Sequence, residues 1–229
     1  MRLSIIMPVL DEAAGIGPAL EALSPYRRRG AELIVVDGGS RDGTLALAHP
    51  FADRTHSAPR GRAAQMNAGA ALAQGDVLLF LHADTRLPAD ADRLIGDGLA
   101  ESGRTWGRFD VRIPGGLVLA LIALMMNLRS RLTGIATGDQ AMFVRRETFQ
   151  AAGGFPPIAL MEDVALSARL RRSSRPLCLR ARVTASARRW RRHGLVRTIM
   201  LMWRLRLAFF FGADPATLAQ QYGYAPRER

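Results

Sequence analysis

The sequence predicts an α/β fold, in which a mostly parallel sheet is flanked by helices and followed by a basic helical extension. Short apolar runs alternate with helix-like segments through the first half of the chain, and strands joined through helices pair in parallel by right-handed crossovers. Residues 77–81 are apolar at every position, which is typical of a central strand covered on both faces. With 229 residues, 48% of them hydrophobic, the chain can bury the core of one domain.

The alternation of elements is clearest between residues 3 and 81. Residues 12–23 have helical apolar spacing that is weakened by two glycines and by Pro18. Gly75 follows the alanine-rich segment 62–73 and provides a helix stop. We therefore expect strands at residues 3–7, 32–36 and 77–81, and helices at residues 12–23, 42–48 and 62–73.

The pattern changes after residue 104. Residues 108–113 alternate arginine or aspartate with apolar side chains, and this alternation predicts a strand at a sheet edge. Glycine and proline pairs at residues 153–157 predict a loop. We expect residues 1–190 to form the α/β domain and residues 191–229 to form a basic, apolar helical extension packed on it.

The arginine content indicates the kind of partner, and the cysteine content indicates the cellular compartment. The net charge is +12, all the basic residues other than histidine are arginine, and they are concentrated after residue 168. This asymmetry indicates an anionic partner, such as nucleic acid, a membrane surface or a phosphorylated substrate, or else a solvated arginine-rich face. The single cysteine, Cys178, cannot form an intramolecular disulfide, which favours a cytoplasmic protein without a structural zinc site.

Two apolar segments bear on membrane contact. Residues 117–126 are wholly apolar, but about 10 residues rise only ~15 Å as a helix and cannot span a bilayer. Residues 198–211 are apolar apart from Arg204 and Arg206 and contain Trp203. They predict either an interfacial helix on an anionic membrane, at the inner face of the membrane, or a core helix with two arginines at its edge.

Two predicted strands end in acids. Asp37 follows the apolar run 33–36, and Asp84 follows the run 77–81 and His82. Ligands of open α/β sheets bind beyond the carboxyl ends of the strands, so both acids are candidates for a binding site. The alternative is that each acid caps the following helix.

The loop after the second strand narrows the functional class. Residues 37–44 read DGGSRDGT, and glycines there let a ligand approach the main chain. A Walker phosphate loop needs a lysine, which the chain lacks. The GIG at residues 15–17 lacks the third glycine of the dinucleotide fingerprint, and the surroundings of Ser40 do not match a nucleophile elbow.

Five motifs in order resemble family 2 glycosyltransferases with the GT-A fold. They are MPVLDE near the start, VVDGGSRDGT, the segment 62–76, FLHAD at residues 80–84 and MED at residues 161–163. The resemblance covers roughly residues 3–170. Within it, LHADT, GDQ at residues 138–140 and the ending RRW, HG, YG resemble a small stand-alone bacterial subgroup linked to radical-SAM (selenodomain) or arsenosugar-biosynthesis genes.

This resemblance implies a nucleotide-diphosphate sugar as donor and a divalent cation, Mg²⁺ or Mn²⁺, as cofactor. The metal-binding DxD motif of the family reads His82, Ala83, Asp84 here, so its first acid is missing. Asp84 alone would hold the metal, because phosphates and waters can complete the shell. The positions that match donor-binding residues are Pro8, Asp11, Glu12, Asp37, Gly39, Asp42, Arg62, Asn67, His82, Ala83 and Asp84.

The catalytic positions also follow from the resemblance. An inverting transferase needs a base to accept the proton of the acceptor hydroxyl, and Asp163 with Glu162 beside it matches that base, with Asp139 as the alternative. Asp163 could instead cap the helix that follows. Gly138, Gln140 and Trp190 would lie at the acceptor end, and Arg189 would stabilise the leaving diphosphate. Ser186 replaces the glutamine of the processive QxxRW motif, which argues against polymer synthesis.

Two further classes remain open. One is a non-catalytic, membrane-associated binder of nucleotide sugars. It is suggested by His82, which replaces the first acid of the DxD motif, and by residues 198–211. The other is a nucleic-acid-binding module, suggested by the arginine-rich tail. Acids at the strand ends would repel phosphates, so no nucleic acid is expected as a partner.

Overall fold

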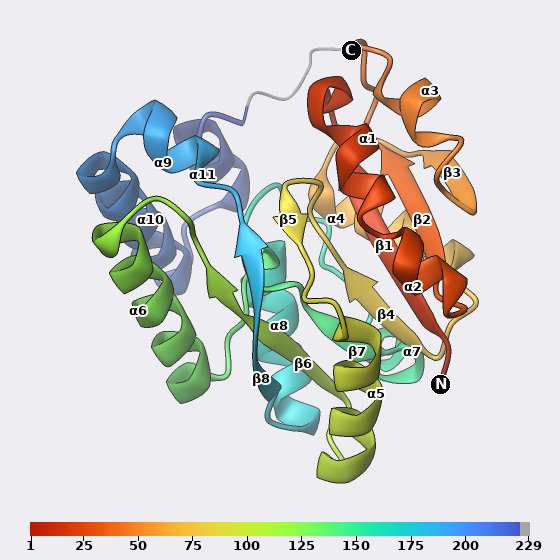
Figure 1. Cartoon of the computed structure of the whole chain (residues 1–229). Coiled ribbons are helices and arrows are strands. Elements are labelled where there is room, and N and C mark those ends of the chain that lie inside the picture. The colour runs from red at the N-terminus through yellow and green to blue at the C-terminus, as the bar shows by residue number, and fades with distance from the viewer. Residues whose placement is uncertain (225–229) are drawn as a thin grey trace.

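The computed structural model describes residues 1–224 as one sheet with helices packed on both faces (Figure 1). The order of its eight strands is β3-β2-β1-β4-β7-β6-β8-β5. The strands are β1 (Leu3–Val9), β2 (Glu32–Asp37), β3 (Arg54–Ser57), β4 (Val77–Phe80), β5 (Thr85–Arg86), β6 (Trp106–Arg112), β7 (Phe143–Arg145) and β8 (Leu177–Ala185). The helices are α1 (Ala13–Glu21), α2 (Ser24–Arg28), α3 (Thr44–Ala48), α4 (Arg62–Leu72), α5 (Ala91–Ser102), α6 (Leu117–Thr133), η1 (Gly138–Gln140), α7 (Arg146–Ala151), α8 (Glu162–Ser173), α9 (Arg188–His193), α10 (Leu195–Phe210) and α11 (Pro215–Gln221).

The first half of the sheet is parallel, as the alternation predicts. β1 pairs with β2 and β4, and β2 pairs with β3, all in parallel. Every residue of β2 and β4 is buried, because helices cover both faces of these central strands. The segment expected as one helix at residues 12–23 divides into α1 and α2. β3 escaped the sequence analysis because its four residues, RTHS, are mostly exposed and polar.

The second half of the sheet corrects one expectation. β6 was expected at a sheet edge, but it lies between β7 and β8. Arg108 on β6 is fully buried, and its guanidinium donates to Asp110, to Ser130 Oγ at 3.1 Å and to the Asn127 carbonyl at 3.1 Å. Arg108 and Asp110 therefore face partners inside the protein, which replace water for these buried groups, and only Arg112 at the end of β6 is exposed.

Hydrophobic clusters lie on the two faces of the sheet. One contains Leu20 of α1, Ile95 of α5 and Leu119 of α6, and the other contains Met66 of α4 and Leu166 of α8. A third, smaller cluster joins α10 and α11 to residues 160–161. Within residues 1–224, no helix is both long enough and apolar enough to cross a membrane.

Gly69 lets α4 pack directly on the sheet. A Cβ atom at this position would lie 2.5 Å from Ile6 Cγ2 on β1 and 3.0 Å from Val36 Cγ2 on β2. Such distances are shorter than any ordinary carbon contact, so a larger residue would push the helix away from both strands. Gly69 thus determines how close the first turns of α4 come to the strand ends.

We predict that Gly69→Ala lowers the free energy of unfolding by about 1 to 3 kcal/mol, because the added methyl group overpacks the contact with Ile6. Gly15→Ala in α1 is the matched control, since nothing lies within 4 Å of its Cβ position. Urea unfolding followed by circular dichroism measures both variants. Equal stability of the two variants would contradict the close packing of α4.

Candidate active site

The carboxyl ends of β1, β2 and β4 meet at one edge of the sheet. The side-chain amide of Gln65, on α4, donates to the Val9 carbonyl at 2.8 Å and to the Val36 carbonyl at 2.9 Å. Gln65 therefore holds the ends of β1 and β2 together from the helix above them. The loops that follow these strands begin at this edge, as expected for a ligand site in a sheet of this kind.

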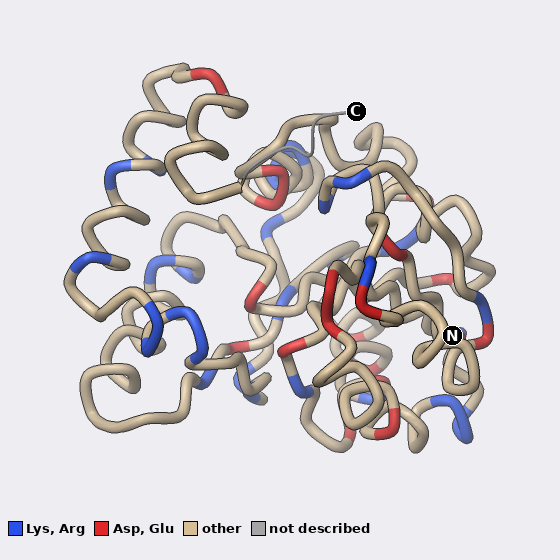
Figure 2. The backbone as a smooth tube through the Cα atoms, turned by 90° about the horizontal axis from the view of Figure 1, so that it is seen from above, with Lys and Arg blue, Asp and Glu red and all other residues tan. Residues whose placement is uncertain are grey.

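A cleft opens at this edge and contains two adjoining cavities of about 260 Å³ and 300 Å³. We name them after the roles that the family resemblance predicts for their residues, the first as the donor cavity and the second as the acceptor cavity. Viewed from above, basic and acidic positions of the backbone meet around the middle of the molecule (Figure 2). The residues that line both cavities are Arg62, His82, Asp84, Leu160, Glu162, Arg188 and Tyr222.

Six of the predicted donor-site residues line the donor cavity. They come from the ends of β1 and β4 and from the first turn of α4, and they are Pro8, Glu12, Arg62, His82, Ala83 and Asp84. Asp84 is an exposed residue on the wall of both cavities, near the charge of Arg188. It is therefore available to a ligand.

The loop acids play a different part. Asp37 is buried and accepts hydrogen bonds from the backbone N–H groups of Gly39 and Ser40, each at 2.9 Å. Asp42 accepts from Ala13 N at 2.9 Å and Thr44 N at 3.1 Å. These carboxylates organise the loop after β2. Asp37 does not cap α3, because Gly43 occupies the N-cap position of that helix.

Three other predicted residues lie outside the two cavities. Asp11 accepts from Arg41 N at 2.8 Å and thereby joins the loops after β1 and β2. Asn67 bonds both backbone groups of Phe155, at 2.8 and 2.9 Å. Gln140 is fully buried, and its side-chain oxygen accepts from Thr137 N. All three side chains support the walls of the cleft.

Asp163 lies in the acceptor cavity at the start of α8. Its Oδ2 accepts a hydrogen bond from Gly138 N at 2.8 Å, and its Oδ1 accepts one from Val164 N at 2.7 Å. These bonds fix the direction of the carboxylate. A side chain at position 138 would lie 2.4 Å from the His82 ring, so glycine is needed where η1 approaches the end of β4.

Asp139 is engaged by a neighbour. Its carboxylate lies 3.7 Å from His82 Nδ1, although 54% of the Asp139 side chain is exposed. Burial of the carboxylate would raise its pKa, but the contact with His82 and the charges of Arg62 and Arg206 outweigh that effect and lower the pKa of Asp139 below its ordinary value. Asp139 is thus held as a carboxylate beside His82.

Glu162 has the opposite environment. Burial raises the pKa of its carboxyl group to about 7, and the neighbouring Asp163 adds to the rise, while Arg62 opposes it. Glu162, at the start of α8, therefore carries a proton much of the time near neutral pH.

The C-terminal segment lines the cleft with Arg189 and Trp190, as the resemblance implied, and with three residues that the sequence did not indicate as site residues, Arg188, Arg206 and Tyr222. Arg188 pairs with Glu12 at 2.7 Å, across 176 positions of the chain. Arg189 stacks on the Tyr222 ring at 3.6 Å from its centroid. Trp190 and Arg206 also line the acceptor cavity. In the sequence, only the RRW and YG motifs indicated that this segment has a functional role. The ion pair of Arg188 with Glu12 depends on the fold and could not be predicted.

Asp84 is the residue that the sequence predicts to hold a metal ion. Residues 1–224 contain no cluster of three or more histidine, cysteine or acidic side chains arranged to hold a metal ion. Mg²⁺ and Mn²⁺ bind to one or two carboxylates when substrate phosphates and waters supply the other ligands. An exposed carboxylate at the rim of the donor cavity fits that type of site, and a closed protein cage does not exist there.

Comparisons with known proteins agree on the family. The model of Glycosyl transferase family 2 matches residues 4–145. A PGL/p-HBAD biosynthesis glycosyltransferase of Mycobacterium bovis is 39% identical over 98 residues, which cover 40% of this chain and 38% of that protein. The Dodecaprenyl-phosphate galacturonate synthase of Rhizobium johnstonii is 31% identical over 110 residues, which cover 42% of this chain and 32% of that protein. The matches thus span well under two thirds of these relatives.

Solved structures show the same GT-A fold. TarS of S. aureus in complex with UDP has a TM-score of 0.67 at 18% identity, covering 81% of this chain and 60% of that chain. The mannosyltransferase PcManGT of Pyrobaculum calidifontis, in complex with GDP-Man and Mn²⁺, has a TM-score of 0.66 at 20% identity, covering 97% and 69%. The expected α/β class, with its mostly parallel sheet flanked by helices, is therefore confirmed.

The environment of Glu162 predicts a pH dependence of stability. Its folded-state pKa of about 7 lies above the ordinary 4.5, so the folded state binds more protons between these values and stability falls as pH rises through this window. We expect Glu162→Gln to remove a fall of about 3 kcal/mol in the free energy of unfolding, which corresponds to this pKa difference. Urea unfolding at a series of pH values measures it. Glu101→Gln, at an exposed position of α5, is the control, and an unchanged slope in Glu162→Gln would contradict the assignment.

Proposed function

Since the chain belongs to glycosyltransferase family 2, we propose that it transfers a sugar from a nucleotide-diphosphate sugar to a hydroxyl group of an acceptor. The observation that carries this proposal is the single cleft at the strand ends, which has the exposed carboxylate of Asp84 and the oriented carboxylate of Asp163 on its walls. The carboxylate of Asp84 would lie at the diphosphate of a donor, and the carboxylate of Asp163 would lie at the hydroxyl group of an acceptor.

The donor cavity has the chemistry of a nucleotide-diphosphate site. Arg62 and Arg188 provide guanidinium groups that can bind the diphosphate with paired hydrogen bonds. Pro8 and the loop organised by Asp37 would border the base and ribose. UDP and GDP-Man are bound by the proteins of the same fold named above. Asp84 would hold a divalent cation, whose charge would offset that of the diphosphate.

In the transfer step, the acceptor oxygen forms a bond to the anomeric carbon while the bond from that carbon to the diphosphate oxygen breaks. The electron pair leaves with the diphosphate, whose charge Arg62 and Arg188 stabilise, and Asp163 accepts the hydroxyl proton. Direct displacement inverts the anomeric centre. We favour Asp163 over Asp139 as the base because Asp139 already contacts His82.

We also propose roles for three more residues of the cleft. Arg189, Gly138 and Trp190 lie at the acceptor cavity, and we assign them to acceptor binding and leaving-group stabilisation. We retain the division into residues 1–190 and 191–229, of which residues 225–229 lie outside the described residues, as well as the cytoplasmic location at the inner face of a membrane. Membership of the radical-SAM or arsenosugar-linked subgroup likewise remains a proposal.

Donor binding gives the first test. We expect one nucleotide sugar from a panel of uridine and guanosine diphosphate sugars to raise the melting temperature by several degrees in the presence of Mn²⁺, because a ligand that binds only the folded state stabilises it. Asp84→Ala should lose the part of the rise that depends on Mn²⁺, whereas Asp97→Ala, at an exposed position of α5, should keep it. A metal-independent rise of the same size would contradict the role of Asp84.

The base assignment gives the second test. With the nucleotide sugar found in that panel, Asp163→Asn should reduce release of the nucleoside diphosphate by roughly 100-fold or more, while donor binding persists, because loss of a general base slows the proton-transfer step. Asp139→Asn is the matched variant and should retain far more turnover. If Asp139→Asn is the inactive variant and Asp163→Asn turns over normally, the two roles are reversed.

A further inference from the structure

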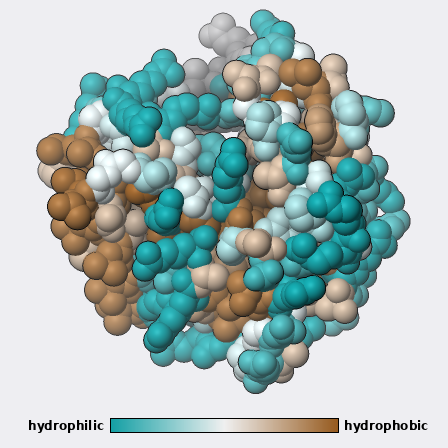
Figure 3. All heavy atoms as spheres, in the orientation of Figure 1, coloured by the Kyte–Doolittle hydropathy of each residue, from teal (hydrophilic) through white to brown (hydrophobic). Residues whose placement is uncertain are grey.

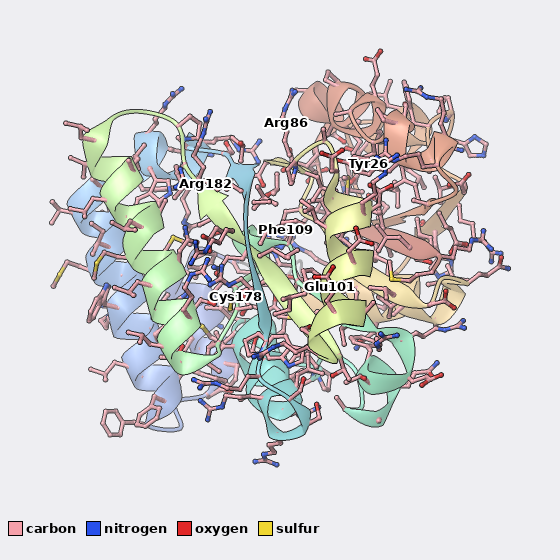
Figure 4. The ribbon with its side chains drawn as sticks, turned by 60° about the horizontal axis from the view of Figure 1, so that its bottom comes forward. Tyr26, Arg86, Glu101, Phe109, Cys178 and Arg182 are labelled. Carbon is pink, nitrogen blue, oxygen red and sulfur yellow. The ribbon has the colours of Figure 1, made fainter. Side chains whose placement is uncertain are left out.

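Helices α6 and α10 lie side by side on one flank of the protein, in two different views (Figure 1, Figure 4). Their outer faces carry large apolar side chains at helical spacing, and in the space-filling view hydrophobic residues cover the surface over α6 (Figure 3). We call this surface the α6–α10 face. Its exposed members include Leu117, Leu121, Leu124, Leu128 and Leu132 on α6, and Val196, Met200, Trp203, Leu207 and Phe210 on α10.

The exposure is too large for an ordinary surface. Leu117 is 90% exposed, Trp203 73% and Phe210 81%. Soluble monomers rarely expose a continuous apolar patch of this kind unless the patch binds something. The inner side chains of the same helices, such as Leu119 and Leu205, are buried, so both helices are amphipathic and their outer faces remain uncovered within residues 1–224.

Charge distinguishes between the partners that could cover this face. Neither α6 nor α10 contains an acidic residue, while Arg197 and Arg204 of α10 and Arg191 and Arg192 of α9 are exposed around it. A second copy of the chain would bring arginines against arginines. An anionic bilayer instead accepts apolar side chains below its headgroups and attracts each arginine with about 1 kcal/mol.

Helix α10 also reaches the acceptor cavity, from its inner side. Thr198, Met202 and Arg206 of α10 line it. Behind Arg206 lies Arg129 of α6, whose Nε and Nη2 atoms are buried and have no hydrogen-bond partner among the described residues. Burial lowers the pKa of Arg129 to about 10, and the charge of Arg206 adds to this effect. Two guanidinium groups held together with unused donors favour binding of an anion.

We propose that the α6–α10 face binds an anionic lipid bilayer, and that Arg129 and Arg206 receive the phosphate group of a lipid acceptor at the inner border of that face. The bilayer contact is inferred from the exposed apolar and basic side chains of the α6–α10 face alone. The lipid acceptor rests on the proposed function, because it would extend from the membrane into the acceptor cavity toward the base Asp163.

Sedimentation of the full chain with lipid vesicles tests the bilayer contact. We expect binding to phosphatidylcholine vesicles that contain about 30% phosphatidylglycerol and little binding to phosphatidylcholine alone. The double variants Leu121→Ser with Leu124→Ser, and Trp203→Ser with Phe210→Ser, should each reduce binding at least roughly tenfold. Leu47→Ser, at an exposed apolar position of α3, should not. Failure of the wild-type chain to bind either vesicle, or its assembly into dimers through this face, overturns the proposal.

Melting temperatures measured with vesicles that carry a long-chain alkyl phosphate test the acceptor class. The phosphate lipid should stabilise the wild-type chain more than phosphatidylglycerol does, and Arg206→Gln and Arg129→Gln should each lose that difference while Arg93→Gln, an exposed position of α5, retains it. Inorganic phosphate that stabilises equally well would overturn the lipid acceptor. Neither assay depends on turnover, so a failure here is distinct from a failure to bind or use a nucleotide sugar.

Discussion

The parallel pairing of β1 with β2 and β4 is the constraint on which the site depends. It brings three strand ends to one edge of the sheet and, with them, the loops that carry Glu12, Asp37 and Asp84. Gln65 fixes the ends of β1 and β2 through two hydrogen bonds to their carbonyls. Helix α4 can pack closely on β1 and β2 only because Gly69 has no side chain. The packing of the core and the geometry of the site therefore depend on the same helix.

The C-terminal helices complete this arrangement through charge. The ion pair of Arg188 with Glu12 joins the end of the chain to its beginning, and Tyr222 contacts Arg189 beside the acceptor cavity. At the start of α8, burial raises the pKa of Glu162, whereas the carboxylate of Asp163 is oriented by two backbone N–H groups. Adjacent acids therefore differ in their environments, which is a common way for a site to separate their roles.

Sequence could predict the features that depend on local pattern. Apolar runs that end at Asp37 and Asp84 are visible in the chain, and the parallel sheet follows from their alternation with helices. It could not predict features that depend on distant partners. β6 was misplaced at an edge because its buried Arg108 is satisfied by α6, and the exposed stripe of α6 depends on how that helix packs. Arg206 and Tyr222 reach the cleft only through the path of the C-terminal helices.

The most direct test of the central claim is a crystal structure of the chain with Mn²⁺ and a nucleotide sugar. We expect an anomalous peak for Mn²⁺ at about 2 Å from an Asp84 oxygen, the diphosphate beside Arg62, and the anomeric carbon open toward Asp163. Mn²⁺ and nucleotide bound away from Asp84, or a sugar that points away from the acceptor cavity, would contradict it.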